Sequence, residues 1–316
     1  MDAAAARRSR GPAHVPALAL AGDVDAGVLR AAGWRIAGRL PLTPYADPRD
    51  APSFVDLDEL LADARLDAVA LDGSDPDLAG HLPALRAAGL LVLLPTPAPL
   101  STDAVRAAQA VDAAPELVVG FRCRWQPWAR TVAAAAPLAG GPPLQVTVRG
   151  WPAGEAAAAE LVDLVRSWCG EVVAVAARPA PLPAAALPDG AEVTWALLTE
   201  AGATVLVTPE GGPAPRARLS FRTARLEAGP GGVRWYGGAE LPLLPVPDLR
   251  RTRLPVPPGA DAGLLAAAKA LLEAVGDGDL PGQDPPPAGL PDLLAAARVL
   301  EALRTSARTG ALVRTG

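Results

Sequence analysis

The sequence predicts an α/β protein in two domains: a doubly wound parallel sheet, followed by an α/β domain with a mixed, largely antiparallel open sheet. Three observations lead to this fold class. Between residues 17 and 121, short apolar runs alternate with helical patterns, as in parallel sheets. Beyond residue 190, short apolar segments follow one another with glycine-rich turns between them, which favours antiparallel pairing. The chain has 316 residues, 50% of them hydrophobic, so it can bury two cores.

The first domain is expected to consist of strands and helices in strict alternation. Continuous apolar runs predict strands at Ala17–Ala21, Trp34–Leu40, Asp67–Leu71, Leu90–Leu94 and Leu117–Phe121. Helical periodicity predicts the intervening helices at Val28–Ala32, Leu57–Ala64, Leu78–Ala88 and Thr102–Ala113. Strands that are apolar throughout are expected where helices cover both faces of a sheet.

The second domain begins with a strand, a helix and a strand, and then continues with strands alone. The predicted elements are a strand at Leu144–Arg149, a helix at Ala156–Trp168, and strands at Val172–Ala177, Glu192–Leu198, Thr204–Thr208, Ala217–Thr223 and Val233–Tyr236. Two closing helices are expected at Leu264–Val275 and Leu293–Ala307, with a loop rich in proline and glycine between them.

Composition argues against several classes of protein. The net charge is −5 and the arginines are scattered along the sequence, so no basic stripe for nucleic acid is expected. No apolar run is long enough to cross a bilayer, and Pro16, Asp23 and Asp25 interrupt the stretch that a signal peptide would need. Residues 1–13 are predicted to form a disordered tail.

The cysteines and histidines favour a cytoplasmic chain without a metal site. Cys123 and Cys169 each stand in an apolar context, so we expect free buried thiols rather than a disulfide or a redox pair. His14 and His81 are the only histidines, and neither has ligand spacing to a cysteine or to an acid cluster.

The sequence patterns resemble a known family along nearly the whole chain. Val55–Leu100 contains two apolar strands, an Ala/Leu helix and a final turn, Pro95-Thr96-Pro97; this segment resembles the core of the Gfo/Idh/MocA family of NAD(P)-dependent sugar and cyclitol dehydrogenases. The resemblance continues through G-F-R-C-R-W-Q-P at Gly120–Pro127, the helix and strand at Leu161–Val175, and the closing helix and tail at Ala296–Val313.

The resemblance implies a domain plan, a cofactor and partners. Residues 14–122 would form a Rossmann-type nucleotide-binding domain, and residues 123–316 the mixed-sheet domain. NAD(P) would be the cofactor, a sugar-like small molecule the substrate, and a homo-oligomer the assembly.

The cofactor candidates start in the first strand–helix turn, Gly22-Asp23-Val24-Asp25-Ala26-Gly27. The family's Gly-x-Gly-x-x-Gly pattern matches Gly22 and Gly27, whereas Val24 replaces the glycine that lets backbone approach the pyrophosphate. Asp23 and Asp25 place carboxylates where a helix N-terminus ordinarily receives an anion. The alternative is a structural turn with an aspartate cap.

Three further residues complete the candidate cofactor set. Arg39 is the penultimate residue of the second strand, where an arginine would favour a 2′-phosphate over free ribose hydroxyls. The other two, Ser74 and Pro97, follow the third and fourth strands.

The candidate catalytic residues are Thr96, Glu160 and Asp163. In the family the turn after the fourth strand carries a lysine, and Thr96 stands in its place; a neutral hydroxyl cannot act as a cation. Glu160 occupies the place of the family's histidine and is a candidate general base. A solvated or helix-capping carboxylate is the alternative for Glu160, and a hydrogen bond at the domain interface is the alternative for Asp163.

Two functions remain open from the sequence. One is an oxidoreductase of this family with a degenerate active site and little dehydrogenase activity. The other is a non-catalytic protein that binds a small molecule or a partner, such as an active paralogue. Trp125, Trp128, Trp151 and Trp168 would either stack against a sugar or pack in the core.

Overall fold

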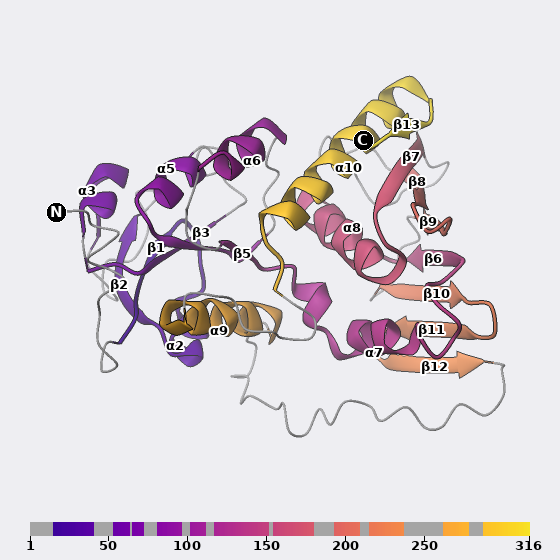
Figure 1. Cartoon of the computed structure of the whole chain (residues 1–316), viewed down its shortest axis with the longest axis horizontal. Coiled ribbons are helices and arrows are strands. Elements are labelled where there is room, and N and C mark those ends of the chain that lie inside the picture. The colour runs from indigo at the N-terminus through magenta and orange to yellow at the C-terminus, as the bar shows by residue number, and fades with distance from the viewer. Residues whose placement is uncertain are drawn as a thin grey trace. The chain divides into compact units, whose positions relative to one another are not determined.

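The structure, a computed structural model, describes residues 15–40, 53–63, 65–72, 81–96, 102–111, 117–151, 154–179, 193–208, 215–236, 262–277 and 287–316. The tail at residues 1–13 lies outside this part of the chain. Figure 1 shows the elements by label. They form two compact units: Met1–Arg122 with Pro255–Leu294, and Cys123–Leu254 with Ala295–Gly316.

A five-stranded sheet of order β2-β1-β3-β4-β5 forms the centre of the first unit. Its strands are β1 (Ala17–Ala21), β2 (Arg35–Leu40), β3 (Ala68–Leu71), β4 (Leu91–Leu94) and β5 (Leu117–Val119). Each pairs with its neighbours in parallel, and β1 and β3–β5 are almost wholly buried. The predicted parallel sheet is therefore confirmed.

Helices cover both faces of this sheet. They are α2 (Ala26–Ala32), α3 (Leu57–Ala62), α5 (Leu82–Ala87), α6 (Thr102–Gln109) and α9 (Ala262–Asp277). Figure 1 shows α2 and α9 on one side of the sheet, with α3, α5 and α6 on the other. This arrangement explains why the strands are apolar throughout.

Helix α9 belongs to the first unit, although the sequence suggested a division into two consecutive segments at residue 122. Its residues Leu264, Leu265 and Leu271 lie in one hydrophobic core with residues of β1 and α2. The indole Nε1 of Trp34 also donates a hydrogen bond of 2.8 Å to the carbonyl of Ala268. Periodicity predicts the helix, but it does not show which sheet the helix covers.

The second unit contains an eight-stranded sheet of order β12-β11-β10-β6-β9-β8-β7-β13. The strands are β6 (Gln145–Arg149), β7 (Val172–Pro179), β8 (Val193–Thr199), β9 (Thr204–Thr208), β10 (Arg216–Ser220), β11 (Arg225–Gly229), β12 (Gly232–Tyr236) and β13 (Val313–Arg314). Only β6 and β9 pair in parallel among these described strands. The predicted mixed, largely antiparallel sheet is confirmed.

One face of the second sheet is buried and the other is exposed. Burial alternates along β6, β9, β10 and β11, as a half-covered sheet requires. The helices of this unit are α7 (Pro127–Ala135), α8 (Glu155–Cys169) and α10 (Leu290–Thr309), whose residues from Ala295 onward belong here.

Several details differ from the sequence prediction, which did not include β11 or β13. The expected strand Ala217–Thr223 is a hairpin arm, because the chain turns after Ser220 and returns as β11. Helix α7 was not predicted. Within the described residues, no helix combines the length and the apolar character that a membrane span needs.

Candidate functional site

The first turn follows the carboxyl end of β1 and turns toward α2. Gly22 has a φ of 92°, a backbone conformation that favours glycine, so this position needs its glycine. Val24, by contrast, is only 4% exposed, and its side chain belongs to the hydrophobic core. The residue that replaces the middle glycine is therefore a packing residue.

Asp25 caps helix α2. Its Oδ1 accepts hydrogen bonds from the backbone amides of Gly27, at 2.8 Å, and Val28, at 3.3 Å. A Cβ atom on Gly27 would lie 3.1 Å from this oxygen, so glycine leaves room for the carboxylate. In a dinucleotide-binding turn, such amides face the pyrophosphate. Here an internal anion engages two of them, which agrees with the aspartate-cap interpretation.

Asp72 lies beside this turn and was missed in the sequence analysis. It follows β3, and β3 pairs with β1 on the side opposite β2, so the strand order reverses here. The amide of Asp23 donates a hydrogen bond of 3.3 Å to Oδ2 of Asp72. A polar residue directly after an apolar strand was the available signal. Asp23 and Asp25 thus lie in the turn, and Asp72 lies beside its backbone.

Arg39 lies near the carboxyl end of β2, opposite Leu20 of β1. Its side chain is half-buried, and its Nε is buried without a hydrogen-bond partner among the described residues. The last two cofactor candidates, Ser74 and Pro97, lie outside the described residues.

Thr96 follows β4 at the carboxyl edge of the parallel sheet and is half-buried. Gly120 sets the path of the backbone before it: the Gly120 amide donates a 2.6 Å hydrogen bond to the carbonyl of Leu94. A Cβ on Gly120 would lie only 2.6 Å from the carbonyl oxygen of Pro95. The Pro95–Thr96 segment therefore sits where the sequence predicted it, after the fourth strand.

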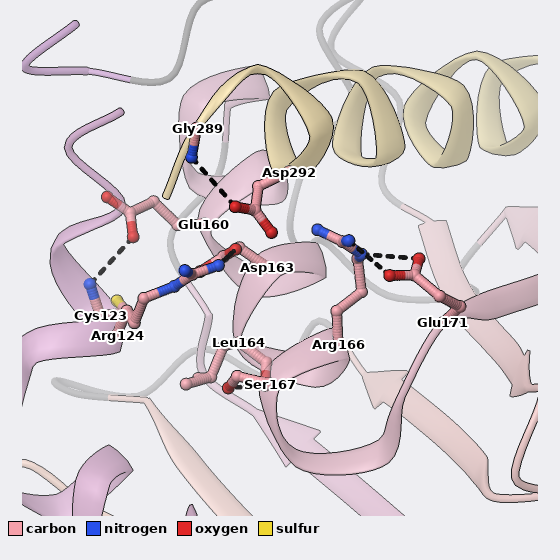
Figure 2. Close-up of polar contacts among 10 residues, drawn as sticks. All are labelled: Cys123, Arg124, Glu160, Asp163, Leu164, Arg166, Ser167, Glu171, Gly289 and Asp292. Atoms are coloured by element: carbon pink, nitrogen blue, oxygen red, sulfur yellow. Dashed lines mark hydrogen bonds and ion pairs between the residues drawn. The ribbon is translucent and has the colours of Figure 1, made fainter. Parts of the chain in front are cut away.

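Glu160 and Asp163 lie one turn apart on α8, in the second unit, and both are buried. Figure 2 shows both carboxylates directed at consecutive residues, Cys123 and Arg124. Glu160 Oε2 accepts a hydrogen bond of 3.0 Å from the Cys123 amide, and it is only 3% exposed. The solvated alternative for Glu160 is therefore wrong.

Asp163 forms a buried, two-pronged ion pair with Arg124. Arg124 Nε donates to Oδ2 at 3.0 Å, and Nη2 donates to Oδ1. The two side chains are 9% and 0% exposed. Together with Glu160, this pair fastens the short 3₁₀ helix η1 (Arg122–Trp125) to α8 at two consecutive residues. Both carboxylates of the candidate catalytic set thus bind residues of η1, Glu160 through a backbone amide and Asp163 through a guanidinium.

The tryptophans of the second unit are mostly packing residues. Trp128 and Trp168 are buried with ring centroids 5.8 Å apart in an edge-to-face arrangement. Trp168 Nε1 donates to the carbonyl of Ala129, and Trp151 Nε1 to that of Ala157. Core packing therefore accounts for these three side chains.

The structure groups the predicted site residues by unit. Gly22, Val24, Gly27, Arg39 and Thr96 lie in the first, and Glu160 and Asp163 in the second. In the part of the chain that the structure describes, no three His, Cys, Asp or Glu residues are grouped as metal ligands.

Comparison with known proteins finds likeness at the level of structure. No protein-family model matches the chain, and no curated protein sequence matches it. Solved structures do. The WlbA dehydrogenase from Bordetella pertussis, in complex with NADH and UDP-GlcNAcA, gives a TM-score of 0.73 at 18% identity, over 96% of this chain and 99% of that chain.

Two further structures show the same likeness. An aldose-aldose oxidoreductase from Caulobacter crescentus, complexed with glycerol, gives 0.70 at 18% identity, over 95% of this chain and 100% of that one. An oxidoreductase from Agrobacterium radiobacter, in complex with NAD+, L-tartaric acid and magnesium, gives 0.67 at 17% identity, over 96% and 99%. The chain therefore has the two-part α/β fold of these oxidoreductases along nearly its whole length.

Proposed function

We propose that this chain is a Gfo/Idh/MocA-type member of the NAD(P)-linked oxidoreductases that has lost ordinary dehydrogenase chemistry. The fold and the sequence motifs support the family. The observation that carries the loss is the Asp25 carboxylate, which accepts the amides of Gly27 and Val28 at the start of α2.

The first turn opposes a dinucleotide in two ways. Asp25 engages backbone donors that would otherwise bind phosphate oxygens, and its charge repels a pyrophosphate. Two like charges about 5 Å apart repel by roughly 1–3 kcal/mol at intermediate dielectric. Asp23 and Asp72 add negative charge at the same edge of the sheet. Weak binding of NAD(H) and NADP(H), in the high micromolar range or weaker, follows from this arrangement.

The candidate catalytic residues oppose hydride transfer as well. Thr96 supplies neither the charge nor the exchangeable proton of a lysine beside a developing alkoxide. Glu160 is buried and accepts the Cys123 amide, so its carboxylate already has a structural role. Loss of one preorganised donor of the lysine type costs about 3–4 kcal/mol, or a hundred- to thousand-fold in rate.

The alternative function is a non-catalytic subunit on the same fold, which binds a small molecule or a partner such as an active paralogue. The aspartate-capped turn is compatible with this alternative, since a binding protein needs no nicotinamide. Homo-oligomerisation stays a prediction for either function.

A fluorescence titration with NADH and NADPH tests the proposal. Asp25→Ser keeps a capping side chain but removes its charge, so dinucleotide affinity should rise about fivefold or more. Asp56→Ser is the matched control, because Asp56 caps α3 of the same unit through the Glu59 amide. Tight binding to the wild type, or equal affinities for all three proteins, contradicts the proposed role of Asp25.

Turnover measurements complete the test. We expect no robust activity on a panel of polyols and sugars with either nicotinamide, and no rescue by Thr96→Lys alone, because the first turn is unchanged. Wild-type turnover of about one per second, a rate ordinary for enzymes, would overturn the proposal. If Glu160→Gln abolished that turnover while keeping the bond to Cys123, Glu160 would be its base.

A further inference from the structure

Five arginines gather on the exposed face of the second sheet, although they are far apart in the sequence. Register places Arg216 of β10 opposite Arg149 of β6, and Arg218 of β10 opposite Glu227 of β11. Glu227 in turn lies opposite Arg234 of β12. Residues two apart on a strand share a face. The arginine face therefore comprises exposed side chains from four adjacent strands: Arg149, Arg216, Arg218, Arg225 and Arg234.

Arginines outnumber carboxylates on the described strands of this face. Arg149 and Arg216 are like charges directly opposite each other, an arrangement that destabilises an antiparallel pair. Glu227 is the one carboxylate on the described strands β6, β10, β11 and β12. Its Oε1 already accepts a hydrogen bond from Arg218, at 2.7 Å, and its Oε2 accepts one from the Tyr236 hydroxyl, at 3.1 Å. Arg218 and then Tyr236 hold the pKa of Glu227 below its ordinary value, so it stays ionised.

The surrounding unit is positive as a whole. By sequence, the second unit contains 17 basic and 12 acidic residues, whereas the first contains 12 basic and 22 acidic residues. The net charge of −5 thus conceals a positive unit with a positive sheet face.

An open pocket of about 440 Å³, called the cavity below, adjoins this face at the hairpin between β10 and β11. Its lining residues are Phe221, Arg222, Thr223, Ala224, Arg225 and Tyr236. Cavities of roughly 300–1,000 Å³ are typical of small-ligand sites. The Phe221 amide bonds to the Ala224 carbonyl, and Thr223 Oγ1 donates to the Ala139 carbonyl at 3.1 Å, so the hairpin is fixed before any ligand binds.

Arg222 and Arg225 are the cations of this cavity. Neither guanidinium has a hydrogen bond or ion pair with another residue in the described ranges. A guanidinium matches phosphate oxygens in two-pronged geometry, and a phosphate monoester carries a charge of about −1.5 to −2 at neutral pH. The two arginines complement that group in charge and in donors, whereas the Tyr236 hydroxyl already donates to Glu227.

We infer that this cavity binds a small phosphorylated molecule, with its phosphate held by Arg222 and Arg225 and its remainder against the arginine face. The site lies wholly in the second unit, so it does not depend on whether the first unit binds a nicotinamide dinucleotide. The volume of about 440 Å³ is large enough for a small phosphate ester.

Titration with inorganic phosphate, against sodium chloride at equal ionic strength, tests this inference. Arginine Nε–H resonances followed by NMR should give a saturable change at Arg222 and Arg225. The double variant Arg222→Ala/Arg225→Ala should bind at least about tenfold more weakly. The double variant Arg222→Lys/Arg225→Lys keeps the charge but loses the planar guanidinium groups. Its phosphate affinity should therefore lie between those of the wild type and the double alanine variant.

The matched control is Arg178→Ala, an exposed arginine on β7, several strands away in the same sheet. It should bind phosphate like the wild type. Binding that survives in the double variant, or is lost in Arg39→Ala of the first unit instead, overturns the assignment. So does a response no larger than that to chloride. A further contradicting result would be tighter binding of an oligothymidylate than of phosphate, weakened equally by loss of any arginine of the face. That result would show a non-specific surface for polyanions rather than a pocket.

Discussion

At the scale of single residues, Arg124 and Asp163 show what a buried ion pair does in this fold. Both are almost completely buried and joined by two hydrogen bonds. Removal of one partner leaves an uncompensated buried charge, so Asp163→Ala should lower the free energy of unfolding by about 3–5 kcal/mol. Urea denaturation measures this. Arg218→Ala removes an exposed ion pair, that with Glu227, and should leave the urea midpoint nearly unchanged. Equal losses of unfolding free energy in the two variants would show that burial does not strengthen the effect.

Cys169 gives a prediction on pH. Burial raises the pKa of its thiol from the ordinary 9.0 to about 12. The folded state therefore keeps a proton that the unfolded state releases, so this contribution to stability is complete below about pH 9 and is lost as pH rises toward 12. Cys169→Ala should show a shallower loss of stability over that range.

Alkylation provides a second measurement on the same residue. Iodoacetamide at about pH 8 should modify the half-buried Cys123 in the native protein and reach Cys169 only after unfolding, since the thiolate is the nucleophile. Mass spectrometry of tryptic peptides assigns the adducts. Comparable rates at the two cysteines would show that Cys169 is accessible.

At the scale of elements, Gly120 controls how β4 and β5 end. An added methyl group would lie 2.6 Å from the Pro95 carbonyl oxygen. Since this oxygen belongs to the backbone, it cannot move away as readily as the end of a flexible side chain. Gly120→Ala should therefore lower the free energy of unfolding by about 1–3 kcal/mol. Gly231→Ala is the control, because a Cβ there meets no atom within 4 Å. Thermal unfolding should separate the two variants, and a neutral Gly120→Ala would show that the segment before Thr96 can shift.

At the scale of the whole molecule, α9 returns from late in the sequence to complete the first unit. Leu271 is fully buried in a core shared with β1 and α2, so Leu271→Ala should cost about 2–5 kcal/mol. Hydrogen exchange should show lower protection in β1–β5 and unchanged protection in β6–β12. Lys269→Ala, on the same helix, should change neither. Loss of hydrogen-exchange protection confined to the second sheet would show that α9 does not belong to the first unit.

The order and type of most elements could be predicted from the sequence, because helical and strand periodicities are local properties of the chain. The parallel sheet, the mixed sheet and the place of Thr96 after the fourth strand were predicted in this way. Val24 could be recognised as a departure from a glycine pattern, but the core that buries it includes residues of α9, which comes much later in the sequence.

Which distant residues come into contact could be learned only from the folded chain. The burial of Glu160 depends on η1 packing against α8, and Asp72 reaches the first turn because β3 pairs with β1. The arginines of the second sheet look scattered in the sequence, yet strand register brings them to one face. Pairing between distant strands is set by the packing of whole faces rather than by neighbours along the chain, so the charge pattern of this protein emerges only in its fold.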